Sequence, residues 1–243
     1  MAKQPERDYL GRYITIPEDY ADNQPLIDYL LSFITPHRRE LFRKVVQQRT
    51  KHVTLVFENI HKAQNASAVI RSADCFGIQD IHFIEEKYQY AVNEDIVKGS
   101  STWVDIYRHP TTQQACDFLH REGYKIAATT PHGECIDIDN LPVEEKIAIL
   151  FGTELNGLSE TALSRADYRV KIPMVGFTES FNLSASAAII LHVTTTKMRR
   201  SSHVRWQLTP REQNMVLLTW LYRTVKGVDL IAEKFLNNEH LRP

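Results

Sequence analysis

Residues 53–85 have the sequence VTLVFENIHKAQNASAVIRSADCFGIQDIHFIE, and this stretch decides the fold class. Its first segment, Val53–Glu58, is rich in apolar and β-branched residues and predicts a buried strand. Residues 65–76 predict a helix that ends at Gly77, because glycine adopts the left-handed conformation typical of helix ends. The apolar run at 81–85 predicts a second strand. A strand, a helix and a strand in succession indicate a parallel β–α–β unit.

The same alternation continues along the chain towards the C-terminus. We predict further strands at 103–107, 124–130, 147–152 and 168–172, and further helices at 112–122, after Ser159 and at 183–200. Strands that alternate with helices in this way predict a largely parallel α/β sheet.

Both ends of the chain have the periodicity of helices. Residues 25–34 carry apolar side chains at helical spacing, and Thr35–Pro36 supplies an N-cap and a first-turn proline for a second helix. Near the other end, Thr209 and Glu212 have the spacing of a capping box.

The chain therefore divides into three predicted parts. We expect an N-terminal helical extension at 1–50, an α/β domain at 51–202 and a C-terminal helical extension at 203–243. Hydrophobic residues make up 43% of the chain, which is enough for a folded core. The polar start and the lack of an apolar run of roughly 20 residues argue against a signal peptide and a membrane span, so we expect a cytoplasmic protein.

The cysteines and several histidines are candidate metal ligands by residue type. These residues are Cys75, Cys116, Cys135, His61, His82, His132 and His192. Neither a CxxC nor an HExxH spacing occurs, so we expect no metal site and no disulfide framework.

Positive charge is concentrated in two places, although the formal net charge of the chain is only −1. One basic cluster is Arg38, Arg39, Arg43, Lys44, Arg49 and Lys51, and the other is Lys197, Arg199, Arg200, His203 and Arg205. Either cluster alone is compatible with a solvated helix face. Two clusters flanking a neutral core favour a protein that binds a polyanion locally.

Polar residues also gather in three clusters where predicted strands run into loops, the usual place for ligands in α/β sheets. The first cluster is Asn65–Arg71, in which Asn65 can cap the helix. Arg71 is either a surface charge or a planar fork suited to a ribose-phosphate oxygen. Sequences typical of phosphate-binding loops (GxGxxG, GxxxxGK[ST]) and of α/β-hydrolases (GxSxG) do not occur.

The other two clusters follow the last strands of the domain. In Phe151–Gly157 (FGTELNG), glycines flank Glu154, which indicates either close backbone contact or a plain turn. Residues 172–188 (IPMVGFTESFNLSASAA) place Ser180, Asn182 and Ser184 at the start of a helix rich in small residues. The alternative interpretation is an ordinary Ala/Ser-rich core helix.

Together the three clusters resemble the motifs of the SpoU/TrmH family of SPOUT methyltransferases. Residues 65–71 resemble its N-x-x-x-x-x-R motif, FGTELNG its Gly-x-Glu-x-x-Gly motif, and residues 172–188 its third motif with the I-P-M opening and S-[LF]-N-[VL]-S core. Residues 99–103 (GSSTW) also resemble a family sequence. The resemblance spans roughly residues 53–200, and three motifs in the same order make it specific.

This resemblance implies a fold and a cofactor. The implied fold is a trefoil-knotted α/β domain with a parallel sheet, here flanked by N- and C-terminal helical extensions. The knot would bind S-adenosyl-L-methionine, largely through backbone atoms. The implied cofactor-binding residues are Thr129, Gly152, Glu154, Ile172, Met174 and Phe181. Family members usually carry leucine where Phe181 lies, so the apolar wall is kept with a different shape.

The resemblance also implies methyl transfer to a ribose 2'-hydroxyl. It assigns the central role to Arg71, with Asn65, Glu154, Ser180 and Asn182 around it. A guanidinium is a poor base because its pKa exceeds about 12. We therefore expect Arg71 to position and polarise the hydroxyl with help from an RNA phosphate, while Asn65, Ser180 and Asn182 orient Arg71 or the ribose and Glu154 braces its loop.

Helical extensions at both ends resemble the TrmH branch, which methylates the D-loop guanosine of tRNA. The expected RNA-binding residues are Arg38, Arg39, Arg43, Lys44, Arg199 and Arg200. The helix rich in small residues and the extensions also fit a homodimer, in which Arg71 of one subunit would serve the cofactor site of the other. Three alternatives remain open, namely ribosomal RNA as the substrate, a non-catalytic RNA-binding protein on the same fold, and a generic α/β small-molecule enzyme.

Overall fold

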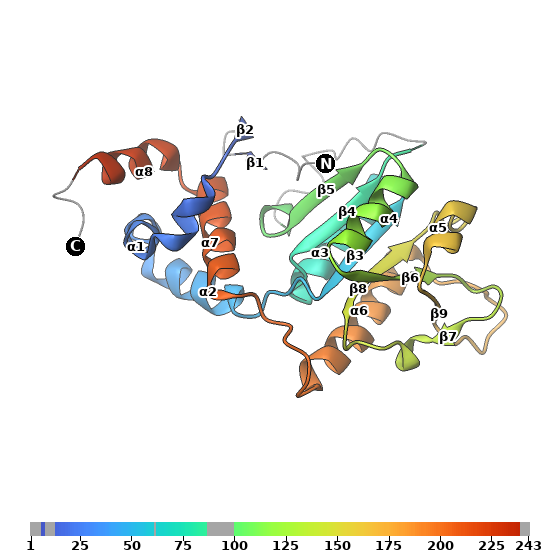
Figure 1. Ribbon diagram of the computed structural model, residues 1–243. Coiled ribbons are helices and arrows are strands. Elements are labelled where there is room, and N and C mark those ends of the chain that lie inside the picture. The colour runs from blue at the N-terminus through green and yellow to red at the C-terminus, as the bar shows by residue number, and fades with distance from the viewer. Residues whose placement is uncertain (1–5, 8–12, 61, 87–99, 239–243) are drawn as a thin grey trace. The chain divides into compact units, whose positions relative to one another are not determined.

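The computed structural model describes residues 6–7, 13–60, 62–86 and 100–238 (Figure 1). His61 and Gly99, which were considered above, lie outside these residues. The chain forms two compact units. One contains Thr50–Trp206, and the other contains Gln4–Arg49 and Gln207–Pro243, so both helical extensions contribute to the same unit.

The first unit is built on a seven-stranded sheet in the order β5-β4-β3-β8-β6-β9-β7, with every neighbouring pair parallel. Its strands are β3 (Val53–Glu58), β4 (Asp80–Ile84), β5 (Asp105–His109), β6 (Tyr124–Thr129), β7 (Ile136–Asp137), β8 (Lys146–Phe151) and β9 (Tyr168–Lys171). The predicted parallel α/β sheet is confirmed. The strand expected at 103–107 begins two residues later, at Asp105.

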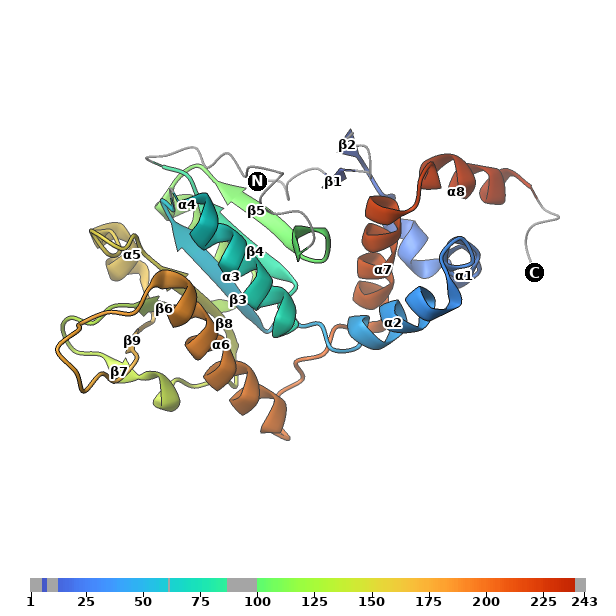
Figure 2. The same cartoon turned by 180° about the vertical axis from the view of Figure 1, so that it is seen from behind.

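Helices cover both faces of this sheet. On one face lie α3 (Ala63–Cys75) and α6 (Leu183–Arg200), which pack against each other and are nearest the viewer in Figure 2. The other face carries α4 (Thr112–Arg121) and α5 (Glu160–Arg165). Two short 3-10 helices, η2 (Ser100–Thr102) and η3 (Ile138–Asn140), complete the unit. The apolar side chains of alternate strand positions therefore form one core on each face.

Helix α3 begins earlier than the sequence predicts. Lys62 is its N-cap residue, without a side-chain capping bond, and the helix already includes Asn65. The capping role considered for Asn65 is therefore wrong. Its amide is free of the helix terminus and bonds elsewhere, as described below.

The second unit is helical. It contains η1 (Glu18–Asp22), α1 (Gln24–Leu31), α2 (Pro36–Val46), α7 (Pro210–Thr224) and α8 (Val228–Asn237), together with the short antiparallel pair β1 (Glu6–Arg7) and β2 (Tyr13–Ile14). Thr35 caps α2, and the capping box of Thr209 and Glu212 is present at α7, as predicted. Trp220 is buried, with the ring of Phe42 and the guanidinium of Arg49 each 5.3 Å from its ring centroid. No helix among the described residues is long and apolar enough to cross a membrane.

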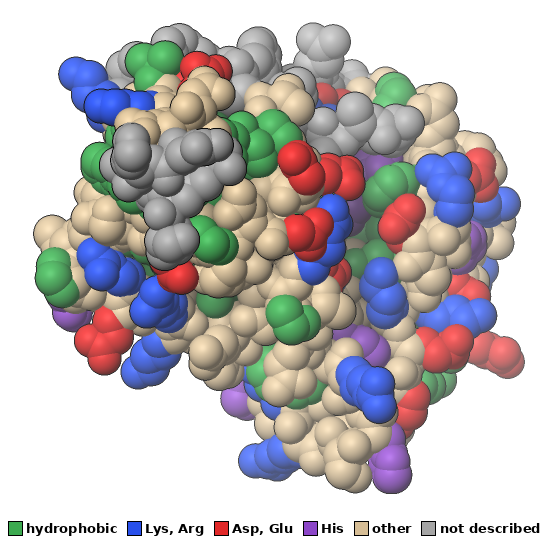
Figure 3. Space-filling model, turned by 60° about the vertical axis from the view of Figure 1, so that its left-hand side comes forward, with side chains coloured by type: hydrophobic (Ala, Val, Ile, Leu, Met, Phe, Trp, Pro, Cys, Tyr) green, Lys and Arg blue, Asp and Glu red, His purple; other side chains and the backbone are tan. Residues whose placement is uncertain are grey.

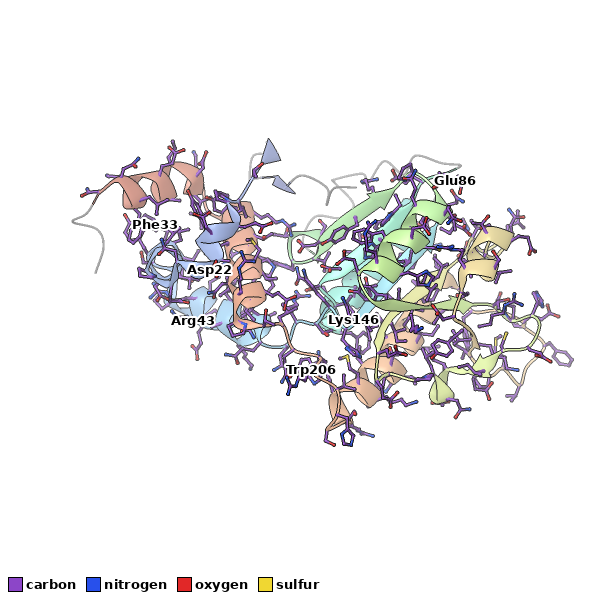
Figure 4. The ribbon with its side chains drawn as sticks, in the orientation of Figure 1. Asp22, Phe33, Arg43, Glu86, Lys146 and Trp206 are labelled. Atoms are coloured by element: carbon purple, nitrogen blue, oxygen red, sulfur yellow. The ribbon has the colours of Figure 1, made fainter. Side chains whose placement is uncertain are left out.

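The strand order decides where the three polar clusters meet. Strands β3, β8, β6 and β9 are successive neighbours and parallel, so their carboxyl ends lie along one edge of the sheet. Figure 4 shows this polarity, with Lys146 at the amino end of β8 and Glu86 beyond the carboxyl end of β4. Each cluster follows one of these carboxyl ends.

Candidate active site at the carboxyl edge of the sheet

The carboxylate of Glu154 joins three loops at this edge. Its Oε2 atom accepts a hydrogen bond from Lys62 Nζ at 2.5 Å, and its Oε1 atom accepts from Asn65 Nδ2 at 2.9 Å and Asn182 Nδ2 at 3.0 Å. These donors follow β3 and β9, while Glu154 follows β8. We call Lys62, Asn65, Glu154 and Asn182 the Glu154 cluster.

Asn182 uses both ends of its amide. Its oxygen accepts from Ser184 N at 2.9 Å and from Ser184 Oγ at 2.5 Å, which caps helix α6, while its nitrogen donates to Glu154. The start of α6 is therefore fixed to the loop after β8. Ser184 supports the cluster through Asn182 and not by direct contact with the carboxylate.

The loop after β8 is held in a tight turn, which explains its two glycines. A Cβ atom on Gly152 would lie 2.1 Å from the carbonyl carbon of Gly157, so only glycine fits there. Thr153 and Gly157 exchange two backbone hydrogen bonds of 3.0 Å, and Gly157 has a φ of +63°. The close backbone contact expected from the sequence is present, and it is a contact of the loop with itself.

The other predicted cofactor-binding residues lie on neighbouring strand ends. Thr129 ends β6, and its hydroxyl donates to the carbonyl of Leu150 on β8 at 3.0 Å. Ile172 directly follows β9 and is half-buried against the core. Met174 is half-buried and Phe181 is 46% exposed. The edge thus combines a hydrogen-bonded backbone turn with accessible apolar surface, which suits a nucleoside.

Two predicted catalytic residues have no partner among the residues that the structure describes. Arg71 is exposed on α3 and Ser180 is exposed before α6, and neither forms a hydrogen bond or an ion pair there. Cys75, one helical turn after Arg71, is also exposed. The structure therefore brings Asn65, Glu154 and Asn182 together, but leaves Arg71 and Ser180 available to ligands.

The predicted RNA-binding residues of α2 differ in their availability. Arg39 donates to the carbonyl of Leu31 at 3.0 Å, Arg43 pairs with Asp28 at 2.9 Å, and Arg38 lies 5.4 Å from the ring centroid of Phe42. Lys44, by contrast, is exposed and pairs with nothing in the described part of the chain.

At the end of α6, Arg199 is engaged and Arg200 is exposed. The Arg199 guanidinium lies 4.1 Å from the ring centroid of Trp206 and donates to the carbonyl of Phe76 at 3.3 Å. Partial burial lowers the pKa of Arg199. On the face drawn in Figure 3, basic and acidic side chains are interspersed over the coloured surface. The availability of a basic side chain to a ligand therefore depends on the contacts of that residue.

Sequence reasoning missed Lys62 and Glu58. Lys62 supplies the cation of the Glu154 cluster, and its position next to the N-x-x-x-x-x-R motif was the available signal. Glu58 is 2% exposed at the end of β3 and bonds to residues on two other elements. The signal there was a carboxylate at the end of a strand that is apolar except for Thr54.

The match to a known family spans most of the α/β unit. Residues 52–192 match the model of the SpoU rRNA Methylase family. The chain belongs to this family. Its parallel sheet, and the three motifs at the carboxyl edge of that sheet, are accordingly those of a SpoU methylase.

Relatives extend the similarity to the helical unit. The chain is 38% identical over 212 residues to the tRNA (guanosine(18)-2'-O)-methyltransferase of Borreliella burgdorferi, which covers 87% of this chain and 96% of that protein. It is 32% identical over 188 residues to the protein of the same name in Thermus thermophilus, which covers 77% and 97%. Among solved structures, the A. aeolicus TrmH/SpoU tRNA modifying enzyme matches with a TM-score of 0.69 at 26% identity, covering 78% of this chain and 97% of that one.

Proposed function

We propose that this SpoU methylase is an S-adenosyl-L-methionine-dependent RNA 2'-O-ribose methyltransferase that modifies the D-loop guanosine of tRNA. The observation that carries the proposal is the Glu154 cluster, in which one residue from each of the three motifs is joined by hydrogen bonds, while Arg71 of the first motif has no partner among the described residues. The names of the relatives, which share most of the chain length, support the tRNA substrate.

The residues at the sheet edge fit the cofactor. S-adenosyl-L-methionine supplies an electrophilic methyl group on a positively charged sulfur. The backbone of the turned loop at 152–157 and the apolar side chains of Ile172, Met174 and Phe181 would hold its adenosine, next to Thr129.

Arg71 is proposed to hold the reacting ribose. Its planar fork of donors suits the 2'-hydroxyl and a neighbouring phosphate, and no described residue occupies those donors. The side-chain amides of Asn65 and Asn182 both donate to Glu154, so in this proposal they set the geometry of the loops. Ser180 is the remaining polar side chain available to the ribose.

The complete site is proposed to need two copies of the chain. Arg71 and the Glu154 cluster share no hydrogen bond or ion pair within the described residues of one chain. In a homodimer, Arg71 of one subunit would complete the cofactor edge of the other. The same proposal includes a trefoil knot and a cytoplasmic location. It also includes phosphate contacts from the basic residues of α2 and from Arg199 and Arg200.

Methyl transfer to defined RNAs tests the proposal. Labelled S-adenosyl-L-methionine would be incubated with unmodified tRNA or with ribosomal RNA fragments, using wild type and Arg71→Ala, and the 2'-O-methyl site would then be mapped. Labelling of one D-loop guanosine, lost in the variant, is expected. The family model is named for rRNA, so labelling confined to the ribosomal fragments would replace the tRNA substrate with that second candidate.

A further inference from the structure

A second carboxylate, Glu58, lies beneath the loop that carries Glu154. It ends β3 and is 2% exposed. Its Oε1 atom accepts from Thr112 Oγ1 at 2.5 Å and Ser159 Oγ at 2.6 Å, and its Oε2 atom accepts from Ser159 N at 2.8 Å. One buried side chain thus connects β3 with α4 and α5.

Hydrogen bonds to Glu58 replace the water that a carboxylate loses on burial. Burying an ionised carboxylate is expensive unless hydrogen bonds replace its water. Among the described residues Glu58 forms no ion pair with lysine or arginine, and three neutral donors compensate it instead. The rest of the strand, VTLVF, is fully buried and apolar except for Thr54, so an apolar residue would suit the position of Glu58 if packing were the only requirement.

Ser159 ends the loop at 152–158, which we call the cofactor loop. It follows the turned segment at 152–157 and is the N-cap of α5, where its Oγ accepts from Ala162 N at 3.1 Å. Glu58 accepts from both the amide and the hydroxyl of Ser159, so it fixes the end of the loop in position and orientation.

The segment from β3 into α3 therefore holds the loop at two points. Lys62 and Asn65 hold its exposed carboxylate, Glu154, while Glu58 holds its buried end at Ser159. A rigid connection at both points prevents the loop from tilting away from the sheet edge. Preorganised loops bind ligands more tightly because less ordering is required on binding.

We propose that Glu58 is a positioning residue for the cofactor loop, which acts through Ser159 on the binding of S-adenosyl-L-methionine. This inference rests on the proposed function, because it assigns residues 152–158 to cofactor binding. Glu58 touches neither the RNA nor the reacting atoms in this proposal. Its loss is therefore expected to weaken cofactor binding while leaving RNA binding unchanged.

Thr112 offers a matched control. It bonds to the same carboxylate but belongs to α4 and forms no hydrogen bond to the loop within the described part of the chain. Its hydroxyl also lies 3.2 Å from Glu86 Oε2, beyond the carboxyl end of β4 (Figure 4). Glu58→Gln turns one acceptor into a donor facing Ser159 or Thr112. Ser159→Ala removes one of the two bonds between Glu58 and the loop, together with the N-cap bond of α5. Thr112→Val removes the bond between Glu58 and α4 and leaves both bonds to Ser159.

The experiment measures binding of S-adenosylhomocysteine to the full-length protein by titration calorimetry, with the melting temperature of each variant. We expect Glu58→Gln to raise the dissociation constant roughly tenfold, because a buried donor loses its acceptor. Ser159→Ala should have a similar effect, and the double variant should add little because both changes break one contact. Thr112→Val should lower the melting temperature but keep the dissociation constant within about twofold.

Two outcomes overturn the inference. Equal affinity of wild type and of both Glu58→Gln and Ser159→Ala removes any role in cofactor binding. An equal loss of affinity in Thr112→Val shows general loosening of the fold and not positioning. Ser159→Ala keeps the test decisive if Glu58→Gln fails to fold. A wild type that binds no S-adenosylhomocysteine overturns the proposed function as well, whereas a binding wild type with unaffected variants overturns this inference alone.

Discussion

The carboxyl edge of the sheet and helix α2 both concentrate ionisable side chains, but they use them differently. In α2, Arg39 donates a hydrogen bond to the carbonyl of Leu31, and Arg43 forms an ion pair with Asp28 of the same unit. Among the residues of the three motifs, Arg71 on helix α3 has no partner within the described part of the chain. A basic run in a sequence therefore shows how many charges are present, whereas the structure shows which of them are available to a ligand.

The largest effect is expected at Arg71. Replacing it with alanine should lower single-turnover methyl transfer about 10²–10³-fold, the usual loss when a preorganised donor to the reacting group is removed. Arg71→Lys should recover little, because an ammonium lacks the planar fork. Arg43→Ala is the control from α2 and should retain most of the rate. Near-full activity of Arg71→Lys would contradict the assignment.

A smaller effect is expected when the cation of the Glu154 cluster is removed. Lys62→Met removes the ammonium group and keeps the amide donors of Asn65 and Asn182 on Glu154, so the loops after β3 and β8 should hold together less firmly. We expect cofactor affinity to fall about tenfold, a typical cost for a group that orients a ligand-binding residue. Calorimetry would show this, and Lys62→Arg should restore most of the affinity. An unchanged affinity in Lys62→Met would remove Lys62 from the site.

Neighbouring cations on α2 allow the comparison to be sharpened within one helix. Lys44 is exposed without a described partner, while Asp28 already neutralises Arg43. Lys44→Ala should reduce the slope of log affinity for tRNA against log salt by about one unit, whereas Arg43→Ala should change it less. Filter binding at several salt concentrations measures both slopes. Equal slopes for the two variants would show that the pairing with Asp28 does not limit availability.

The smallest effect is expected on the stability of the fold, and it appears only below neutral pH. It concerns two buried histidines, His82 and His109, whose ring nitrogens are 2.9 Å apart. Burial lowers the pKa of His82 well below its usual range, with His109 adding to the shift, and burial lowers the pKa of His109 to about 4. Both rings are neutral in the folded state, so the unfolded chain takes up protons first as the pH falls below about 6.5. Stability should therefore be complete above pH 6.5 and should fall between about pH 6.5 and 4.

Urea unfolding as a function of pH measures this loss. Each ring should contribute about 1.4 kcal/mol per pH unit within the window. His109→Gln should lower by one the number of protons taken up on unfolding, and so reduce the slope of stability against pH. His132→Gln, a substitution at an exposed position, is the control and should leave this slope unchanged. A pH dependence that is the same in His109→Gln and wild type would contradict the assignment.

Local signals made the secondary structure predictable. Thr35 before Pro36, and Thr209 before Glu212, cap the helices that their spacing predicts, because capping depends on residues within one turn. The break between α7 and α8 was not foreseen, although Gly227 marks it with a φ of +67°. The strand order also stayed out of reach, because it depends on pairing between segments far apart in the chain.

The candidate site was predictable where a motif carried it and not where a contact did. Asn65, Glu154 and Asn182 were found through their motifs, but their common hydrogen bonds join residues 28 to 89 positions apart. Glu58 was hidden for the same reason, since its bond to Ser159 spans 101 positions. Hydrogen-bond partners of this kind follow from the packing of the sheet, which the sequence pattern does not specify.

The exposed end of α3 provides a built-in attachment point for a spectroscopic label. Cys75 is one turn from Arg71 on the same helix face and is exposed, whereas burial raises the pKa of Cys116 to about 11 and keeps that thiol unreactive. The Cys135 thiol is half-buried and donates to the carbonyls of Thr130 and His132. In a Cys135→Ser background, a fluorophore on Cys75 would report in real time when RNA reaches Arg71, without any engineered cysteine.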